Sequence, residues 1–159
     1  MQMISSERDP IYKKLAAQFE SLLEEKADCI SNLANATALL RGHLGFFWIG
    51  FYLVKEGVLQ LGPFQGPVAC TRIERNRGVC GASWATKKSI VVKDIRDFPG
   101  HIACSEHSKS EIVVPLLDEK GEVWAVLDID SDKMSDFSEL DRKHLEYLVK
   151  IIERKSQNI

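Results

Sequence analysis

The fold is indicated most clearly by Glu111-Ile-Val-Val-Pro-Leu-Leu117, Asp118-Glu-Lys-Gly121 and Glu122-Val-Trp-Ala-Val-Leu-Asp-Ile-Asp130. Two apolar runs of strand length, joined by a short loop with Asp and Gly, predict an antiparallel β-hairpin. Side chains two residues apart share one face of a strand. The core-facing stripe of the second run should therefore consist of Val123, Ala125, Leu127 and Ile129, and the opposite face of Trp124, Val126, Asp128 and Asp130.

The hairpin should also gather three carboxylates. If Leu117 lies opposite Glu122, then Glu111 lies opposite Asp128, and Asp130 is two residues further along the same face. Like charges so close together are unfavourable unless a proton or a cation lies between them. Two interpretations stay open: a solvated acidic edge, or a cluster in which one carboxyl keeps a proton as general acid and the others bind an ammonium group.

The rest of the chain supplies the remaining elements of an α+β fold. Periodicity and capping residues predict helices beginning at Asp9 and Asp28, strands over 46–54 and 58–61, a short helix over 78–86, a strand over 89–93, and a closing helix after Ser138. This order predicts a central, mostly antiparallel sheet with helices on one face. Loops should cover the other face, or that face should bind a ligand.

One strand carries an aromatic pair. Trp48 and Tyr52 lie on the same face, on either side of Gly50. Such a pair is either packed in the core or forms a wall with a gap that suits a small apolar group.

Composition limits the classes of function. A chain of 159 residues, 45% hydrophobic, predicts a single domain over residues 1–159 with a sizeable core. Lys+Arg 21 against Asp+Glu 23 argues against a nucleic-acid binder held by phosphate contacts. The sequence has neither a secretory apolar region at its start nor an apolar run of about 18 residues, so we expect a cytoplasmic protein outside the membrane.

Four cysteines in a compartment that keeps thiols reduced need an explanation. Cys29 lies within a predicted helix, where a small buried side chain is its expected role. Cys70, Cys80 and Cys104 lie outside the apolar periodic segments, and their spacing does not resemble the close pairs of a zinc site, so no metal is expected. They are either inert or a thiol redox set, in which nearby His101 and His107 would favour a thiolate at Cys104.

Four motifs, in order along the chain, resemble the free methionine-(R)-sulfoxide reductases, a GAF-domain family. They are Arg77-Gly-Val-Cys-Gly81, His101-Ile-Ala-Cys104, Ser110-Glu-Ile-Val-Val-Pro-Leu116 and Val126-Leu-Asp-Ile-Asp-Ser131. The resemblance implies a GAF fold with a pocket under loops, reduction of free L-methionine (R)-S-oxide, no bound cofactor, and electrons from thioredoxin, supplied by thioredoxin reductase and NADPH. It also suggests a homodimer formed through the N-terminal helices.

The resemblance implies a role for each candidate residue. Cys104 matches the attacking cysteine, Cys70 the resolving one, and Cys80 a third that relays the disulfide. Substrate binding falls to Glu111, Asp128 and Asp130, at the amine and the sulfoxide oxygen, and to Trp48 and Tyr52, at the S-methyl group. The competing class is a GAF sensor that binds a small molecule without chemistry.

Overall fold

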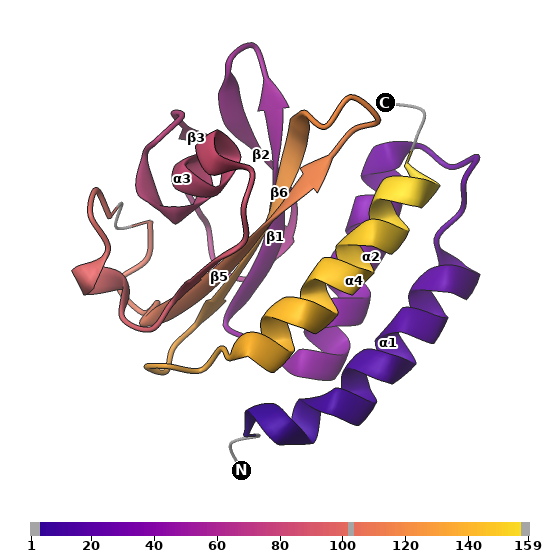
Figure 1. Ribbon diagram of the computed structural model, residues 1–159, viewed down its shortest axis with the longest axis horizontal. Helices are drawn as coiled ribbons and strands as arrows, with labels where there is room; N and C mark the ends of the chain where they lie inside the picture. Colours follow the sequence, from indigo (N-terminus) through magenta and orange to yellow (C-terminus); the bar gives the residue numbers. More distant parts are fainter. Residues whose placement is uncertain (1–3, 102–103, 157–159) are drawn as a thin grey trace.

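The computed structural model describes residues 4–101 and 104–156, and Ile102 and Ala103 of the second motif lie outside that range. Three long helices cover one face of a six-stranded antiparallel sheet of order β3-β2-β1-β6-β5-β4 (Figure 1). The elements are η1 Ser5–Arg8, α1 Asp9–Leu22, α2 Cys29–Leu44, β1 Trp48–Lys55, β2 Val58–Gln65, β3 Arg72–Ile73, α3 Gly78–Thr86, β4 Ile90–Val92, η2 Ile95–Asp97, β5 Ser110–Leu117, β6 Val123–Ser131 and α4 Glu139–Lys155. The predicted α+β architecture is confirmed.

The helices begin where the sequence predicts. Asp28 caps α2 by accepting a hydrogen bond from the Ile30 amide at 2.8 Å, and Ser138 forms a capping box with Asp141 at the start of α4. Capping satisfies amides that have no partner within the helix. None of the helices in the described part of the chain is long and apolar enough to cross a bilayer.

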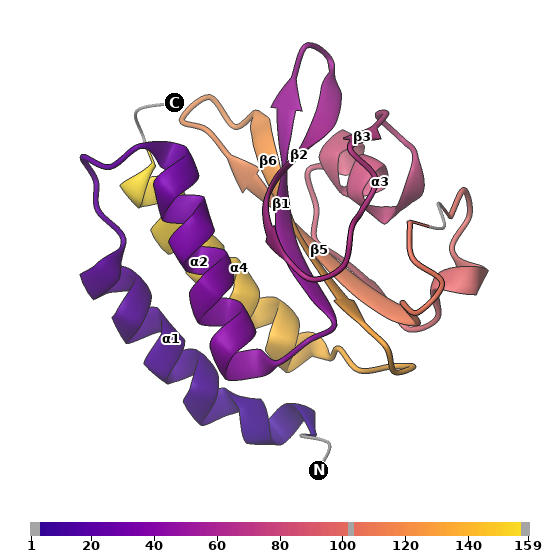
Figure 2. The same cartoon turned by 180° about the vertical axis from the view of Figure 1, so that it is seen from behind.

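The sheet separates two layers of side chains. On one face, α1, α2 and α4 pack against the apolar residues of the central strands, among them Phe51, Ile112 and Leu127, all fully buried. On the other face lie α3 and the loops around it, as Figure 2 shows from behind. Helices therefore enclose the larger core, and the loop-covered face remains for a pocket.

The predicted pairing of Glu111 with Asp128 is wrong. Glu111 lies opposite Asp130, and Val113 lies opposite Asp128. Two offsets of one residue each are the cause: Leu117 pairs with Val123 and not with Glu122, and a bulge in β6 then places Leu116 opposite Ala125. The shift at Glu111 amounts to two residues, so all three carboxylates keep the same face of the sheet.

The same bulge corrects the predicted faces of two neighbouring residues. Trp124 is the extra residue of β6 and packs against the helix-side core, whereas Val123 packs on the pocket side. A bulge places two successive side chains out of alternation. The strict alternation expected from the sequence therefore begins only at Ala125.

β2 is longer than predicted, because it runs through Gly62 and Pro63 to Gln65. The register of β1 against β2 shifts between Gly50 and Tyr52, which places Pro63 beside an irregularity. On its other side β2 pairs with β3 only at Leu59 and Gln60. A proline without an N–H group is tolerated at such a place in a sheet.

Candidate active site

A cavity of about 50 Å³ lies on the sheet face opposite the long helices. Side chains from β1, β5, β6, α3 and the intervening loops line it. They include most of the residues singled out in the sequence: Trp48, Tyr52, Cys80, Cys104, Glu111, Asp128 and Asp130. Cys70 reaches the cavity through its disulfide with Cys104, and His101 also lines the cavity, whereas the His107 ring lies against Phe47 at 6.0 Å.

The sheet register brings the three carboxylates together. Glu111 on β5 faces Asp130 on β6, and Asp128 faces Gly50 on β1. Glu111 is 9% exposed and Asp128 is 6% exposed, so both carboxyl groups are largely withdrawn from water. The arrangement excludes a solvated acidic edge, the first of the two interpretations left open by the sequence.

Burial and mutual repulsion raise the pKa of each carboxyl group. For Glu111 the main cause is burial, followed by the charges of Asp128 and Asp130, and its pKa lies well above the usual range. For Asp130 the main cause is again burial, followed by Asp128, while a hydrogen bond with Ser108 acts in the opposite direction. Burial also raises the pKa of Asp128, but hydrogen bonds with Glu111 and Cys80 oppose it. The cluster therefore tends to keep a proton, and the hydrogen bonds from Glu111 and Cys80 favour the ionised form of Asp128.

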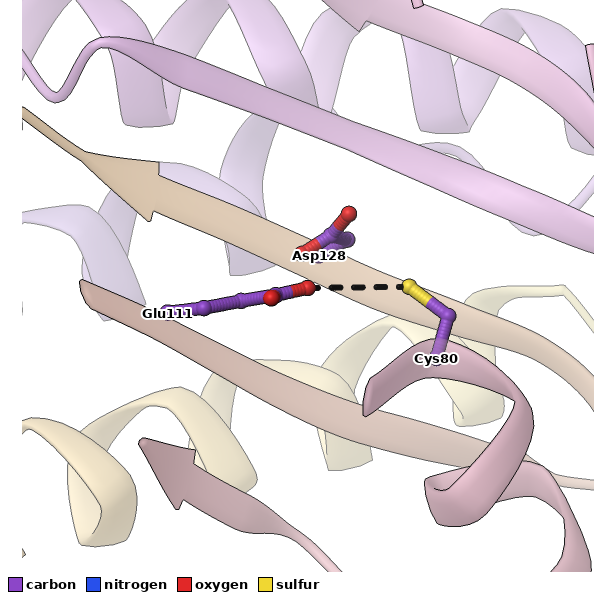
Figure 3. A group of neighbouring side chains, drawn as sticks. All are labelled: Cys80, Glu111 and Asp128. Atoms are coloured by element: carbon purple, nitrogen blue, oxygen red, sulfur yellow. Dashed lines mark hydrogen bonds between the residues drawn. The ribbon is translucent and has the colours of Figure 1, made fainter. Parts of the chain in front are cut away.

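Cys80 lies beneath these carboxyl groups, on the first turn of α3. Its thiol is 3% exposed and donates to Oε1 of Glu111 at 4.0 Å (Figure 3). Burial, and then the charges of Asp128 and Glu111, raise the pKa of this thiol well above its usual value. Cys80 is therefore held as a thiol, which is a poor nucleophile.

Cys70 and Cys104 form a disulfide across 34 residues of sequence, with their Cα atoms 5.4 Å apart. Cys104 lines the cavity, so a sulfur atom that has been oxidised lies at the edge of the carboxylate cluster. Cys29 and Cys80 remain free thiols. Two of the three cysteines outside the periodic segments are thus joined, and the third lies nearby.

The aromatic wall stands beside the cavity. The rings of Trp48 and Tyr52 stack with centroids 6.0 Å apart, and those of Trp48 and Phe64 stack with centroids 5.3 Å apart. Gly50 makes this possible, because a Cβ there would lie 2.5 Å from Cη2 of Trp48 and from Cβ of Phe64. The gap beside the glycine is thus filled by the Trp48 ring itself.

Two contacts of the wall have no signal in the sequence. The Tyr52 hydroxyl donates to the carbonyl oxygen of Cys70 at 2.9 Å, and Nε1 of Trp48 donates to the carbonyl oxygen of Pro67 at 3.0 Å. Both bonds hold the loop that carries Cys70 against β1. Because they run to backbone carbonyls, residue type alone could not reveal them.

A sheet with helices on one face and a loop-covered pocket on the other defines a GAF domain, and the family model described as "GAF domain" matches residues 32–154. A Dictyostelium discoideum protein named GAF domain-containing protein A is 48% identical over 96% of this chain and 97% of its own length.

Further comparisons narrow the class. The Escherichia coli protein named free methionine-R-sulfoxide reductase is 42% identical over 90% of this chain and 87% of its own length. The structure of free methionine-R-sulfoxide reductase from Neisseria meningitidis, in complex with its substrate, superposes with a TM-score of 0.89 at 46% identity, covering 92% of this chain and 89% of that one. The chain belongs to the free methionine-R-sulfoxide reductase family of GAF domains, which confirms the resemblance noted in the sequence.

Proposed function

We propose that this chain reduces free L-methionine (R)-S-oxide to L-methionine, with Cys104 as the nucleophile and a Cys70–Cys104 disulfide as the product on the protein. The observation that carries the proposal is that disulfide, because it lies at the edge of a pocket with buried, proton-holding carboxyl groups. A sensor that only binds its ligand has no use for this combination.

The pocket offers a partner for each part of the free amino acid. The ionised carboxyl group of Asp128, beside Glu111 and Asp130, would bind the ammonium group. The amides of Val79 and Cys80 stand in the first turn of α3, where helix N–H groups have no partner within the helix, and would bind the carboxylate. In a peptide both ends become amides, which explains a preference for the free amino acid over the protein-bound residue.

The aromatic side chains would hold the apolar part of the substrate. Trp48 and Tyr52 present ring surface to the cavity beside the carboxyl groups. The S-methyl group would pack on this surface, which orients the sulfoxide sulfur toward Cys104. Only one configuration at sulfur then points the oxygen toward the carboxyl protons.

The proposed reaction cycle has three steps. The Cys104 thiolate attacks the sulfoxide sulfur, and the oxygen takes a proton from Glu111 or Asp130 and passes to Cys104, so that methionine leaves and a sulfenic acid remains. The Cys70 thiol then attacks that sulfur, which releases water and forms the disulfide. A thioredoxin dithiol reduces the disulfide by exchange, with its electrons coming from NADPH through thioredoxin reductase.

Cys70, and not Cys80, is the resolving cysteine in this scheme. Cys70 is already bonded to Cys104, and Tyr52 holds its backbone at the pocket. Cys80 is buried and its thiol pKa is raised, so attack by Cys80 would be slower. Without Cys70, the sulfenic acid on Cys104 should therefore persist after one methionine has been released.

The cycle needs a reducing compartment, which fits a cytoplasmic protein. A homodimer through the N-terminal helices remains part of the proposal, and sedimentation or size-exclusion measurements would test it.

The test couples turnover to thioredoxin and follows NADPH consumption with the separate R and S sulfoxides. We expect turnover of the R isomer alone, no turnover by Cys104→Ser, and one equivalent of methionine released by Cys70→Ser. Cys29→Ser is the matched control and should behave as the wild type. If Cys104→Ser released as much methionine in a single turnover as the wild type, Cys104 would not be the nucleophile. Folded wild-type protein without R-specific turnover would favour the sensor.

A further inference from the structure

Three side chains beneath the pocket present donor atoms to one small volume. Sγ of Cys80 and one carboxylate oxygen each of Glu111 and Asp128 all lie within 4.8 Å of one another. They come from α3, β5 and β6 and point toward one another (Figure 3). Because each stands on a helix or a strand, their spacing is set by the packed part of the domain.

One of the oxygen atoms in this group has no hydrogen-bond partner among the described residues. Oδ1 of Asp128 is buried and accepts no hydrogen bond from any residue of the described chain. Since Asp128 is only 6% exposed, leaving that oxygen without a donor is costly. A cation from solution would satisfy it. Under the proposed function the substrate ammonium does so during catalysis, and between turnovers the position is open to another cation.

We propose that Cys80, Glu111 and Asp128 bind a thiophilic divalent cation, with zinc as the representative, and that the bound ion excludes the amino group of the substrate. Zinc combines thiolate sulfur with carboxylate oxygen in one site, whereas magnesium and calcium take oxygen alone. Three protein ligands leave a fourth position for water or for Asp130. On binding, the Cys80 sulfur loses its proton to the buffer and forms the bond to the metal.

The present spacing needs only a small contraction to hold the ion. Donor atoms around tetrahedral zinc lie about 3.5 Å apart, given bonds of roughly 2.0 to 2.3 Å. The three ligand atoms lie within 4.8 Å of one another, so side-chain movements that shift these atoms by about 1 Å would bring them to the spacing of a tetrahedral zinc site. The cysteine spacing did not indicate zinc, because that argument looks for closely spaced pairs of cysteines. The present set of ligands contains a single cysteine, Cys80, together with two carboxylates.

The oxidised protein is the right material for the test. Its Cys70–Cys104 disulfide removes the two other thiols near the pocket, so only Cys29 and Cys80 can give sulfur ligation. Titration with Co²⁺ should produce a sulfur-to-cobalt charge-transfer absorption with one equivalent bound, and Zn²⁺ should displace it. Cys29→Ser should keep the absorption, whereas Cys80→Ser should lose it and bind zinc on the order of 100-fold more weakly.

A second variant guards against misfolding. Glu111→Gln keeps the thiol and removes one anionic ligand, so it should weaken zinc binding by about tenfold or more while the circular dichroism and melting curve stay cooperative. A cobalt absorption that persists in Cys80→Ser, or that is absent from the oxidised wild type, would overturn the site.

Exclusion of substrate rests on the proposed function, whereas ion binding does not. A Cys70→Ser/Cys104→Ser variant cannot turn over and keeps Cys80, so the R sulfoxide can be titrated against bound cobalt. Loss of the absorption with rising R sulfoxide supports exclusion, and an unchanged absorption under saturating R sulfoxide contradicts it. Cobalt binding without any turnover by the wild type would refute the proposed function and leave the ion site standing.

Discussion

Gly50 shows how one residue without a side chain shapes the pocket. Its missing Cβ leaves room for the Trp48 ring, which stacks with the rings of Tyr52 and Phe64. Gly50 also faces Asp128 across the sheet, so the aromatic wall and the carboxylate cluster meet at this position. A substitution here changes both the apolar and the polar contacts that we propose for the substrate.

We predict that Gly50→Ala raises KM for the R sulfoxide by roughly tenfold, because the displaced Trp48 ring no longer packs on the S-methyl group. Steady-state kinetics on folded protein would measure it. Gly42→Ala is the control: Gly42 lies exposed on α2 with nothing within 4 Å of an added Cβ, so KM should not change and the melting temperature should rise slightly. Equal KM values in the two variants would contradict the role of Gly50.

The buried carboxyl cluster makes the folded state less stable as the pH rises. The pKa of Glu111 is raised in the folded state, so its contribution to stability is fully present below the pKa of the unfolded chain and is lost as the pH rises through the folded value. We predict that, without ligand, the melting temperature of Glu111→Gln minus that of the wild type increases as the pH is raised from 5 to 9.

The same variant should lose activity on the order of 100-fold or more, because it removes a proton donor and an anion from the pocket. Coupled assays at saturating thioredoxin would measure this loss. A melting-temperature difference that falls as the pH rises would contradict the raised pKa of Glu111.

The ends of β5 and β6 are held by a polar network behind the pocket. Oδ1 of Asp136 accepts from Arg8 at 2.5 Å, and Oδ2 accepts from the Ser131 hydroxyl at 2.5 Å. Ser131 directly follows Asp130, and Ser110, which directly precedes Glu111, donates to the Lys133 carbonyl oxygen at 2.5 Å. The N-terminal segment thus braces the strands that carry the carboxyl groups.

We predict that Asp136→Asn lowers the free energy of unfolding by about 2 kcal/mol, since it removes one of the two carboxylates, Asp136 and Asp141, that pair with the buried Arg8 guanidinium. The activity should fall by about tenfold because Asp130 loses its support. Urea denaturation and kcat/KM would measure the two effects. Glu20→Gln, which breaks the exposed pair with Arg154, is the matched control and should change neither quantity.

Periodicity was sufficient to predict the long helices and the central strands, because each buries one face, but it did not predict β3 or the second half of β2. The register of the β5–β6 hairpin was not predictable, because it depends both on the bulge at Trp124 and on the turn, where Asp118 accepts the amides of Lys120 and Glu122. The carboxyl cluster survived the wrong register, since a shift of two residues preserves the face. The contacts of Tyr52 and Trp48 with backbone carbonyls could not be predicted, because every residue supplies a carbonyl.

The whole molecule divides its tasks between the two faces of the sheet. The helix side holds the larger core, including the fully buried Phe19, Phe51 and Leu127, and the loop side holds the pocket. Chemistry can thus change the loop side at every turnover without disturbing the packing of the helices. The disulfide is the part of the domain that changes.

We predict that the oxidised protein is more stable than the reduced protein by about 4 kcal/mol, because the Cys70–Cys104 bond closes a loop across 34 residues and restricts the unfolded chain. Thermal melts with and without reductant would show the difference. Cys70→Ser should melt at the same temperature in both conditions, and a shift of equal size in that variant would contradict the assignment to this disulfide.

The disulfide also links the survival of the protein to the supply of electrons. When reductant is scarce, molecules accumulate with the loop closed, and the closed form populates the unfolded state less often. Proteases that act on unfolded chains would then remove it more slowly. A cell running short of reducing power would therefore retain a reserve of this protein, ready for use once reductant returns.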